Sequence, residues 1–427
     1  MLHGLVSRFA DVRPDEIRAT LWSFLYFFCL LAAYLILRPL RDEMGIAAGR
    51  ESLQYLFTAT FFVMLVASPL YAGLVAKLPR IKFIPLIYRF FILNLALFWV
   101  LLFFRIEVTW TARVFFVWVS VFNLFAVSVF WSFMADLFST GQGKRLFGFI
   151  AAGGTAGTLL GSSLTVGLSG LIGPANLLVV AGILLELAIF CARRLEPASP
   201  AQTEAKSEDA ETAILGGGML AGFRLIVRSP YLAGIALWVA LLSLAGTFLY
   251  FIQQDVVRSV SEDPAVRTRI FAGMDLAANL MTLALQCVAT GQIIKRLGAG
   301  PSAAVLPVLF AAGFAALIAV PGLWTVVVFQ ALQRTLNFAF SNPAREILFT
   351  SVAREEKYKA KNLVDTVVFR GGDVIWSWAF TGLAALTGSA LAVAGLAIPI
   401  MAGWAGLALW LGRTQERMLE KTKGRET

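Results

Sequence analysis

Two arginines near the start of the chain have the spacing of an anion site. The stretch from Tyr34 to Gly45 reads YLILRPLRDEMG and places Arg38 and Arg41 directly after a long apolar run. Side chains three residues apart share one face of a helix, so the two guanidinium groups are predicted to lie together. A guanidinium binds two phosphate oxygens through parallel hydrogen bonds, and partial desolvation strengthens the attraction. The pair therefore predicts a phosphate-binding site if both side chains face a water-filled cavity.

The depth of these arginines in a membrane decides between that interpretation and a structural one. If the helix begins near Thr20, Arg38 lies about 27 Å further along at 1.5 Å per residue, close to the far interface of a bilayer. A long cation reaches the headgroups from there at little cost, and Asp42 and Glu43 would neutralise the charges. Pro39 removes a backbone donor and is expected to bend or end the helix. The alternative is thus an interfacial anchor.

Three other apolar segments carry polar side chains at helical spacing, which places each set on one helix face. Such stripes should not face lipid, so they predict either the lining of a central cavity or a buried structural network. In the network, Arg334 would pair with Asp275. Arg370 would pair with Asp373 in the same way. The stripes are Asp275, Asn279, Thr282 and Gln286; Gln330, Arg334, Asn337 and Ser341; and Arg370, Asp373, Ser377 and Thr381.

The composition indicates the elements that position these residues. Of 427 residues, 59% are hydrophobic and 15% are charged, and the mean hydropathy is +0.77, more apolar than a typical water-soluble protein. About 20 apolar residues cross a bilayer as a helix. We therefore predict an all-α membrane protein with twelve transmembrane helices in two six-helix halves. Their centres fall near Phe28, Met64, Leu95, Val121, Leu159, Leu184, Leu242, Leu280, Phe310, Val328, Trp376 and Gly403.

A linker divides the chain into the two halves. Residues 196–218 are rich in Ala, Ser and Glu and contain no apolar run, which is typical of a flexible segment. It separates an N-terminal half, residues 1–195, from a C-terminal half, residues 219–427.

A sequence repeat relates the halves. One offset of 218 residues connects Gly73 with Gly291, and Gly153 with Gly371. Parallel six-helix repeats are typical of major facilitator transporters.

The net charge of +10 indicates topology rather than a nucleic-acid partner. With the N-terminus inside, most of the 36 Lys and Arg fall in cytoplasmic loops, which is the positive-inside rule. We expect a multi-pass inner-membrane protein with both termini in the cytoplasm. The loops GLVAKLPRIK (73–82) and GQIIKRLGAG (291–300) resemble the Gly-rich basic loop of the major facilitator superfamily. They predict either a hinge for rocking of the halves or a plain topology loop.

Two further features concern packing and a charged connection. Gly153, Gly157 and Gly161 recur every fourth residue and predict close approach of a neighbouring helix, whether for static packing or for sliding. Residues 344–362 mix basic and acidic side chains, so we expect a cytoplasmic loop there, or a membrane-surface helix or gate.

Two segments resemble the nucleotide translocase family, the ATP/ADP antiporters of plastids and intracellular bacteria and their bacterial relatives. LILRPLRDEMG is similar to the LR-x-L-K/R-D segment in that family's first helix, and SNPAREILFTSVAREEKYKAKNLVDTVVFRGGD, residues 341–373, is similar to a stretch of bacterial members. The resemblance implies a major facilitator fold and exchange of nucleotides or related phosphate-bearing anions. It places Arg41, with Asp42 beside it, at the position proposed to meet substrate, where characterised ATP/ADP exchangers have Lys.

These observations predict a secondary transporter that opens alternately to either side of the lipid bilayer and carries a small anion, a nucleotide first. The sequence contains no GxxxxGK[ST], HExxH or GxSxG, so it indicates neither an ATP-driven pump nor a familiar hydrolase, and no cofactor is expected. A proton-coupled carrier that uses Asp275, Glu186 or Asp365 is one alternative, and a membrane scaffold without transport is another. The expected substrate-binding residues are Arg38, Arg41, Asp42, Asp275, Asn279, Gln330, Arg334, Asn337, Arg370 and Asp373.

Overall fold

The structure is a computed structural model that describes residues 12–49, 51–77, 80–195, 219–288, 298–352, 360–361 and 363–426. The predicted linker, residues 196–218, lies outside this part of the chain. So does most of the second basic loop, residues 291–297, together with residues 78 and 79 of the first.

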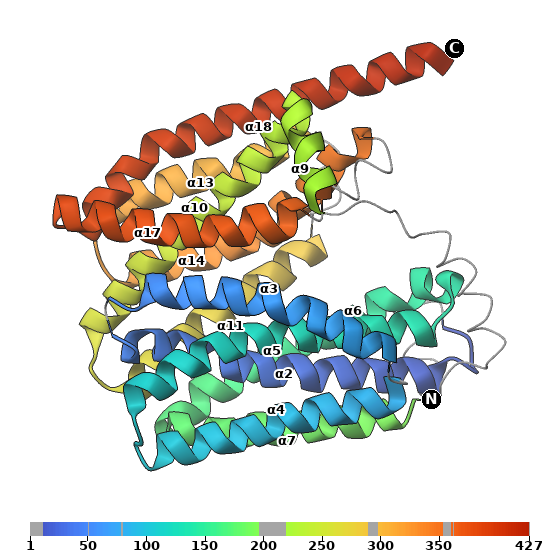
Figure 1. The fold of residues 1–427 in the computed structure, drawn as a ribbon, viewed down its shortest axis with the longest axis vertical. Helices are drawn as coiled ribbons and strands as arrows, with labels where there is room; N and C mark the ends of the chain where they lie inside the picture. The colour runs from blue at the N-terminus through green and yellow to red at the C-terminus, as the bar shows by residue number, and fades with distance from the viewer. Residues whose placement is uncertain are drawn as a thin grey trace. The chain divides into compact units, whose positions relative to one another are not determined.

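Helices account for almost all of the described residues (Figure 1). In the N-terminal half they are α2 (Ile17–Ala47), α3 (Leu53–Lys77), α4 (Arg80–Phe103), α5 (Val108–Leu137), α6 (Thr140–Ile172) and α7 (Pro174–Arg193). In the C-terminal half the long ones are α10 (Pro230–Val260), α11 (Pro264–Val288), α13 (Ala299–Ala319), α14 (Leu323–Leu336), α17 (Phe369–Thr387) and α18 (Ala390–Glu426), with a short α9 (Met219–Arg228) before α10. Each predicted segment contains one of these long helices, so the twelve-helix prediction is confirmed.

Nine of the described helices are long and apolar enough to cross a membrane. The remaining three of the twelve are α11, α14 and α17, which are the helices with the polar stripes. Their polar residues lower the apolar character of α11 and α17, and α14 has only 14 residues before the backbone changes geometry. Polar stripes are tolerated in a bilayer when neighbouring helices cover them. The chain is therefore a multi-pass membrane protein, and its helices with polar stripes need neighbouring helices to shield those stripes from lipid.

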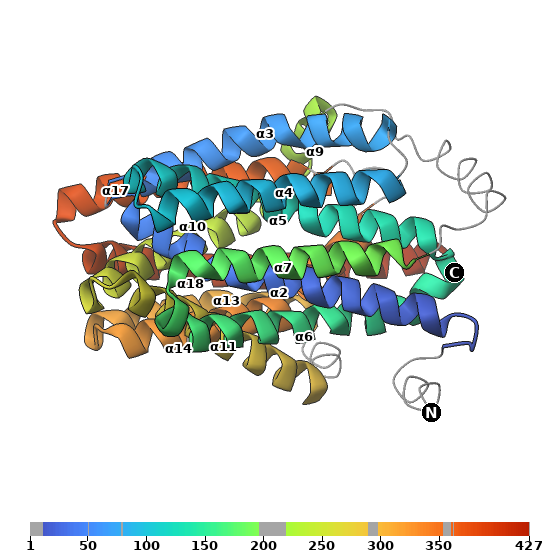
Figure 2. The same cartoon turned by 90° about the horizontal axis from the view of Figure 1, so that it is seen from below.

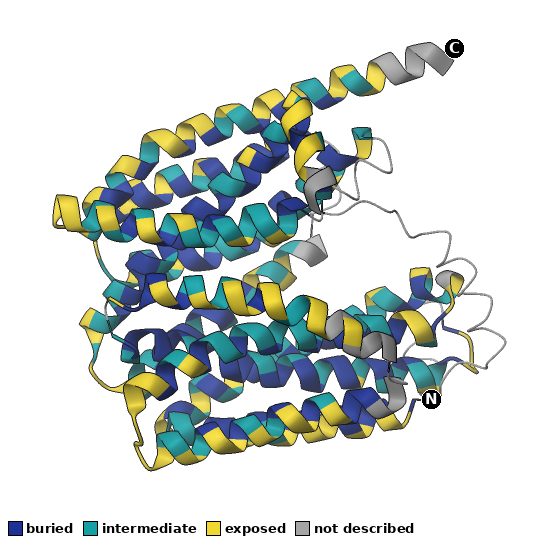
Figure 3. Ribbon diagram, in the orientation of Figure 1, coloured by how far each residue is buried: buried dark blue, intermediate teal, exposed yellow. Residues whose placement is uncertain are grey.

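Many large apolar side chains are exposed on the helices of the N-terminal half. Figure 3 shows exposed positions along α3 and α4. Phe62, Leu93 and Ile183 are 57%, 71% and 58% exposed. A soluble protein rarely leaves so much contiguous apolar surface uncovered. In a bilayer these side chains meet acyl chains, which are as apolar as they are.

The described chain forms two units that differ from the sequence halves in one segment. Unit 1 comprises Met1–Ile214 with Ser261–Asn279, and unit 2 comprises Leu215–Val260 with Leu280–Thr427. The boundary at Ile214 falls within the predicted linker. The first part of α11 belongs to unit 1, where two ion pairs, described below, join it to α2.

Within unit 1, α2 packs against α5, α6 and α7, and α4 lies beside α7 (Figures 1 and 2). The contact between α2 and α6 depends on the glycine stripe. An added Cβ at Gly157 would overlap the carbonyl oxygen of Phe28, and one at Gly161 would overlap that of Ala32. The predicted close approach at these glycines is confirmed.

The substitution Gly157→Ala is expected to lower the free energy of unfolding by about 1–3 kcal/mol, because the methyl group forces α2 and α6 apart. The matched control is Gly167→Ala in the same helix, where an added Cβ meets nothing within 4 Å. That change should be neutral or slightly stabilising, since alanine favours a helix over glycine. Melting temperatures of the two purified variants test this, and equal values would contradict it.

Unit 2 repeats the arrangement with α17 against α10. An added Cβ at Gly372 would lie 2.9 Å from Ser243 Oγ of α10. In each unit, therefore, the helix with the glycine pair packs on the first long helix of that sequence half, as the repeat of 218 residues implies.

A cluster of hydrogen bonds fixes the start of α2. Glu16 is 5% exposed and accepts from Arg145 Nη2 at 2.8 Å, from Gln142 Nε2 at 3.0 Å and from the Arg13 backbone N–H at 3.0 Å. Burial raises the pKa of Glu16, but these hydrogen bonds and the Arg145 charge outweigh it and hold the pKa below its usual value.

The Glu16 cluster predicts a pH-dependent difference in stability. A carboxyl with a lowered pKa in the folded state contributes its full stability above the unfolded value of about 4.3, and loses it as pH falls through the folded pKa. Glu16→Gln should therefore melt below the wild type at pH 7, and the gap should close on acidification to pH values under about 4. A gap in melting temperature that stays constant with pH would contradict this.

Candidate functional site

The charge cluster lies inside α2 rather than beyond its end. Pro39 sits within the helix, which continues to Ala47 and buries Asp42 and Glu43. The expectation that the helix could end at Pro39 is therefore wrong. Neighbouring helices in a membrane protein compensate for the single backbone bond that proline removes.

Glu43 and Arg267 form a tight ion pair within unit 1. Arg267 Nη2 and Nε donate to the two Glu43 oxygens at 2.6 and 2.7 Å. Glu43 is fully buried, and the Arg267 side chain is 11% exposed. Such a two-bond pair satisfies the buried carboxylate and ties α11 to α2.

Arg38 forms a loose ion pair, by which we mean an N–O separation beyond hydrogen-bond distance. Its Nη1 lies 3.6 Å from Asp275 Oδ1, with the two side chains 27% and 2% exposed. Arg41 instead hydrogen-bonds Asp42 at 2.7 and 3.1 Å and lies 5.2 Å from the Phe116 ring centroid.

These pairs correct the expected neutralisation of the cluster. Asp42 pairs with Arg41 as expected, but Glu43 pairs with Arg267, and Arg38 pairs with Asp275. Glu43 follows Arg38 by five residues, so the two project from different sides of α2. Arg38 is thus a partner of Asp275 that the sequence did not indicate.

The second loose pair lies in unit 2. Arg370 Nη1 is 3.7 Å from Asp373 Oδ2, and the arginine side chain is 43% exposed. Ser243 of α10 donates to Asp373 Oδ1 at 2.6 Å, which keeps the carboxylate oriented without the arginine. The pairing of Arg370 with Asp373 is confirmed as one of the two interpretations of this stripe. Trp376 donates to the Ala240 carbonyl at 2.9 Å.

Two buried glutamines of α10 were missed by the sequence analysis. Gln253 and Gln254 are 1% and 3% exposed, and Gln330 donates to Gln253. Adjacent glutamines next to Asp255, in the stretch FIQQDVV near the end of a long apolar run, were the available signal. Across the polar stripes, Thr282 also bonds to Thr335 at 3.4 Å.

The stripe of α14 changes geometry at its C-terminal end. Residues Asn337–Ser341 form a π-helix. Asn337 still follows the α-helical register of Gln330 and Arg334, because its N–H bonds to the Gln333 carbonyl, whereas Ser341 at the end of the π-helix does not. A second π-helix, Val364–Val368, precedes α17. Single π turns are frequent at functional sites.

The predicted loop at 344–362 is partly helical. Helix α15 covers Asn342–Leu348, whereas residues 353–359 lie outside the described part of the chain. Arg345 pairs with Asp365 at 3.1 Å, and Lys361 pairs with Glu346 at 2.7 Å. Pro343 is the second residue of α15, and proline in the first turn favours the start of a helix. The sequence SNPARE therefore contained the signal for this short helix.

The expected site residues divide between the units. Unit 1 holds Arg38, Arg41, Asp42, Asp275 and Asn279; unit 2 holds Gln330, Arg334, Asn337, Arg370 and Asp373. Three pairs among them are close contacts within a unit, and each joins an arginine to an aspartate. Asn279, Arg334 and Asn337 are half-buried on their helices.

Comparison with solved structures defines the fold class. The nucleoside transporter NupG is 16% identical over 95% of this chain and 99% of its own, with a TM-score of 0.58. A point mutant of NupG, with alanine in place of an aspartate, is 15% identical over 94% of this chain and 99% of its own, with a TM-score of 0.64. A D-xylose-proton symporter is 13% identical over 93% of this chain and 96% of its own, with a TM-score of 0.59. No family model and no curated protein matches the sequence. The chain has the twelve-helix fold of major facilitator transporters, as predicted.

Proposed function

We propose that this protein is a secondary transporter that works by alternating access and carries a small phosphate-bearing anion, with a nucleotide as the first candidate. The observation that carries the proposal is the loose pairing of Arg38 and Arg370, two partly exposed arginines on membrane helices. The twelve-helix fold supports the transport part, and the two segments similar to nucleotide translocases support the substrate part.

The contrast between tight and loose pairs separates structural arginines from binding ones. A charge within a transmembrane helix costs roughly 2.5–3.5 kcal/mol on insertion scales, so an arginine there is expected to have either a structural partner or a ligand. Arg267 has a structural partner, because it donates two hydrogen bonds to the buried Glu43. Arg38 and Arg370 hold their carboxylates at 3.6 and 3.7 Å, which leaves their donors available to a ligand.

A phosphate competes well for such donors. It carries more charge than a carboxylate and accepts the two parallel bonds of a guanidinium. Asp275 and Asp373 would balance the arginines in the absence of substrate. We propose Arg41 as a further contact, as the family resemblance implies, with release from Asp42 on binding; the polar neighbours Asn279, Gln330, Arg334 and Asn337 would line the path.

Ligand-dependent stability tests the substrate class. A compound that binds the folded state raises the melting temperature by mass action. We expect ATP and ADP to raise that of the purified protein, and the matching nucleoside and uncharged sugars not to. Equal stabilisation by nucleoside and nucleotide would contradict a site built for phosphate.

A proton-coupled carrier is the second candidate, and the burial of Asp275 favours it. Asp275 is an intramembrane carboxylate that is 2% exposed, and such groups are candidate proton carriers; in this candidate a proton would take the place of Arg38 as its partner. This candidate requires uptake that follows a pH gradient and that Asp275→Asn uncouples.

For the location, we propose the inner membrane with both termini in the cytoplasm. The excess of Lys and Arg in the loops on that side supports this orientation.

A further inference from the structure

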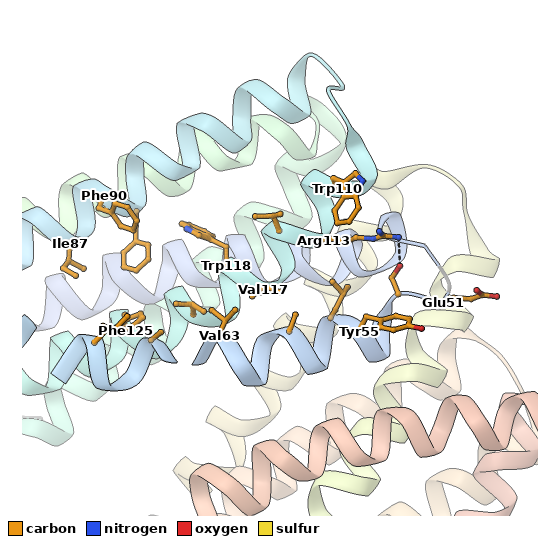
Figure 4. A pocket seen from close by; sticks show the side chains of 18 residues that line it. Glu51, Tyr55, Val63, Ile87, Phe90, Trp110, Arg113, Val117, Trp118 and Phe125 are labelled. Atoms are coloured by element: carbon orange, nitrogen blue, oxygen red, sulfur yellow. Dashed lines mark hydrogen bonds between the residues drawn. The ribbon is translucent and has the colours of Figure 1, made fainter. Parts of the chain in front are cut away.

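A large apolar groove lies within unit 1, and no residue of either loose ion pair lines it. Its volume is about 1100 Å³, and it runs between α3, α4 and α5 (Figure 4). The walls are almost entirely aliphatic and aromatic, with Val63, Phe90 and Val114 along the open side and Phe91 and Trp118 deeper.

One end of the groove is cationic. Arg113 lines it there, six residues into α5, beside Trp110 (Figure 4). Its guanidinium donates to Ser52 Oγ at 3.0 Å and to the Ala48 carbonyl at 3.3 Å, and lies 4.8 Å from the Trp110 ring. Within the described residues it forms no ion pair. These contacts hold Arg113 in place but give its charge no counter-ion in the described part of the chain.

Glu51 also lines the groove, so its position matters for charge complementarity. In Figure 4 its carboxylate points away from Arg113 and from the apolar walls. The inner surface of the groove end is therefore positive, with the exposed Trp110 at its rim. Tryptophan with arginine is the typical pairing at a membrane–water interface.

The length of the groove matches one lipid leaflet. From Arg113 to Phe125, the lining of α5 spans twelve residues, or about 18 Å at 1.5 Å per residue. Half of the hydrocarbon core is about 15 Å thick. A groove with its cation at the interface and its apolar end near the midplane has the dimensions of one phospholipid chain.

We propose that this groove is a specific phospholipid site, with one acyl chain against Val63, Phe90 and Trp118 and the phosphate on Arg113. The open side admits lipid directly from the bilayer, because its exposed wall is continuous with the apolar surface of α3 and α4. An uncompensated guanidinium at the interface binds a phosphodiester through charge-assisted hydrogen bonds. The site does not depend on the transport proposal, since neither loose ion pair contributes to it.

Lipid retention by the purified full-length protein tests this, with native mass spectrometry as the readout. The probes are phosphatidylglycerol and diacylglycerol with the same acyl chains. The wild type should retain phosphatidylglycerol about tenfold more tightly than Arg113→Gln, which is the loss of a charge-assisted contact. Diacylglycerol should bind both proteins equally. The matched control is Arg105→Gln, an exposed arginine between α4 and α5 that does not line the groove.

A second variant tests the apolar part independently of Arg113. Ala67→Phe adds a ring inside the groove and should reduce retention of both lipids. It also keeps the proposal testable if Arg113→Gln does not fold. Unchanged phosphatidylglycerol retention in Ala67→Phe, or in folded Arg113→Gln, would overturn the site. Equal wild-type affinity for the two lipids would overturn the headgroup contact and leave only an unselective apolar groove.

Discussion

Arg267→Met should lower the free energy of unfolding by about 3–5 kcal/mol, because it leaves the fully buried Glu43 carboxylate without its partner. The double variant Glu43→Gln with Arg267→Met should recover most of that loss, since no uncompensated charge remains. Melting temperatures of purified proteins measure both effects, which suits membrane proteins that unfold irreversibly.

The control for this prediction is an ion pair outside the apolar helices. Lys361 Nζ and Glu346 Oε1 lie 2.7 Å apart with side chains 29% and 50% exposed. Lys361→Met should therefore change stability by no more than about 1 kcal/mol. If Arg267→Met and Lys361→Met melt alike, the buried pair does not tie α11 to α2.

Arg370→Gln should weaken binding of the anionic substrate by about 10- to 150-fold, the loss of a charge-assisted hydrogen bond converted to affinity. Folding should persist because Asp373 keeps the hydrogen bond from Ser243. Arg38→Gln should have a similar effect on affinity through the loose pair of unit 1. Substrate titration monitored by melting temperature gives the affinities.

Asp373→Asn provides a test of the sign of the substrate charge. It removes the carboxylate that competes for Arg370, so affinity for a phosphate-bearing anion should hold or increase. A cationic substrate would instead lose its counter-charge. Weaker binding in Asp373→Asn together with unchanged binding in Arg370→Gln would therefore reverse the assignment.

The helices could be predicted because their signal is local. A run of apolar residues long enough to cross a bilayer forms a helix whatever its neighbours are, since the backbone must satisfy its own hydrogen bonds there. The close contact at the glycines of α6 could also be predicted, because small residues at helical spacing permit close approach of another helix. Arg370 and Asp373 were paired correctly for the same reason, as they are three residues apart on one helix.

The partners of the charge cluster could not be predicted, because they come from distant sequence. Glu43 and Arg267 are 224 residues apart. Asp42 and Glu43 looked equivalent as neighbours of Arg38 and Arg41, yet a turn of about 100° per residue sends them to different surroundings. The π-helix at Asn337 could not be predicted either, because polar residues at helical spacing do not indicate whether the backbone that carries them is an α-helix or a π-helix.

Exchange across sealed proteoliposomes tests the central claim most directly. Vesicles are loaded with ADP, labelled ATP is added outside, and uptake is followed with and without a pH gradient. We expect uptake that requires internal ADP, needs no pH gradient and is lost in Arg370→Gln but not in Arg89→Gln. Uptake that follows the pH gradient would favour the proton-coupled carrier, and no flux of any phosphate compound would contradict the proposed transport of phosphate-bearing anions.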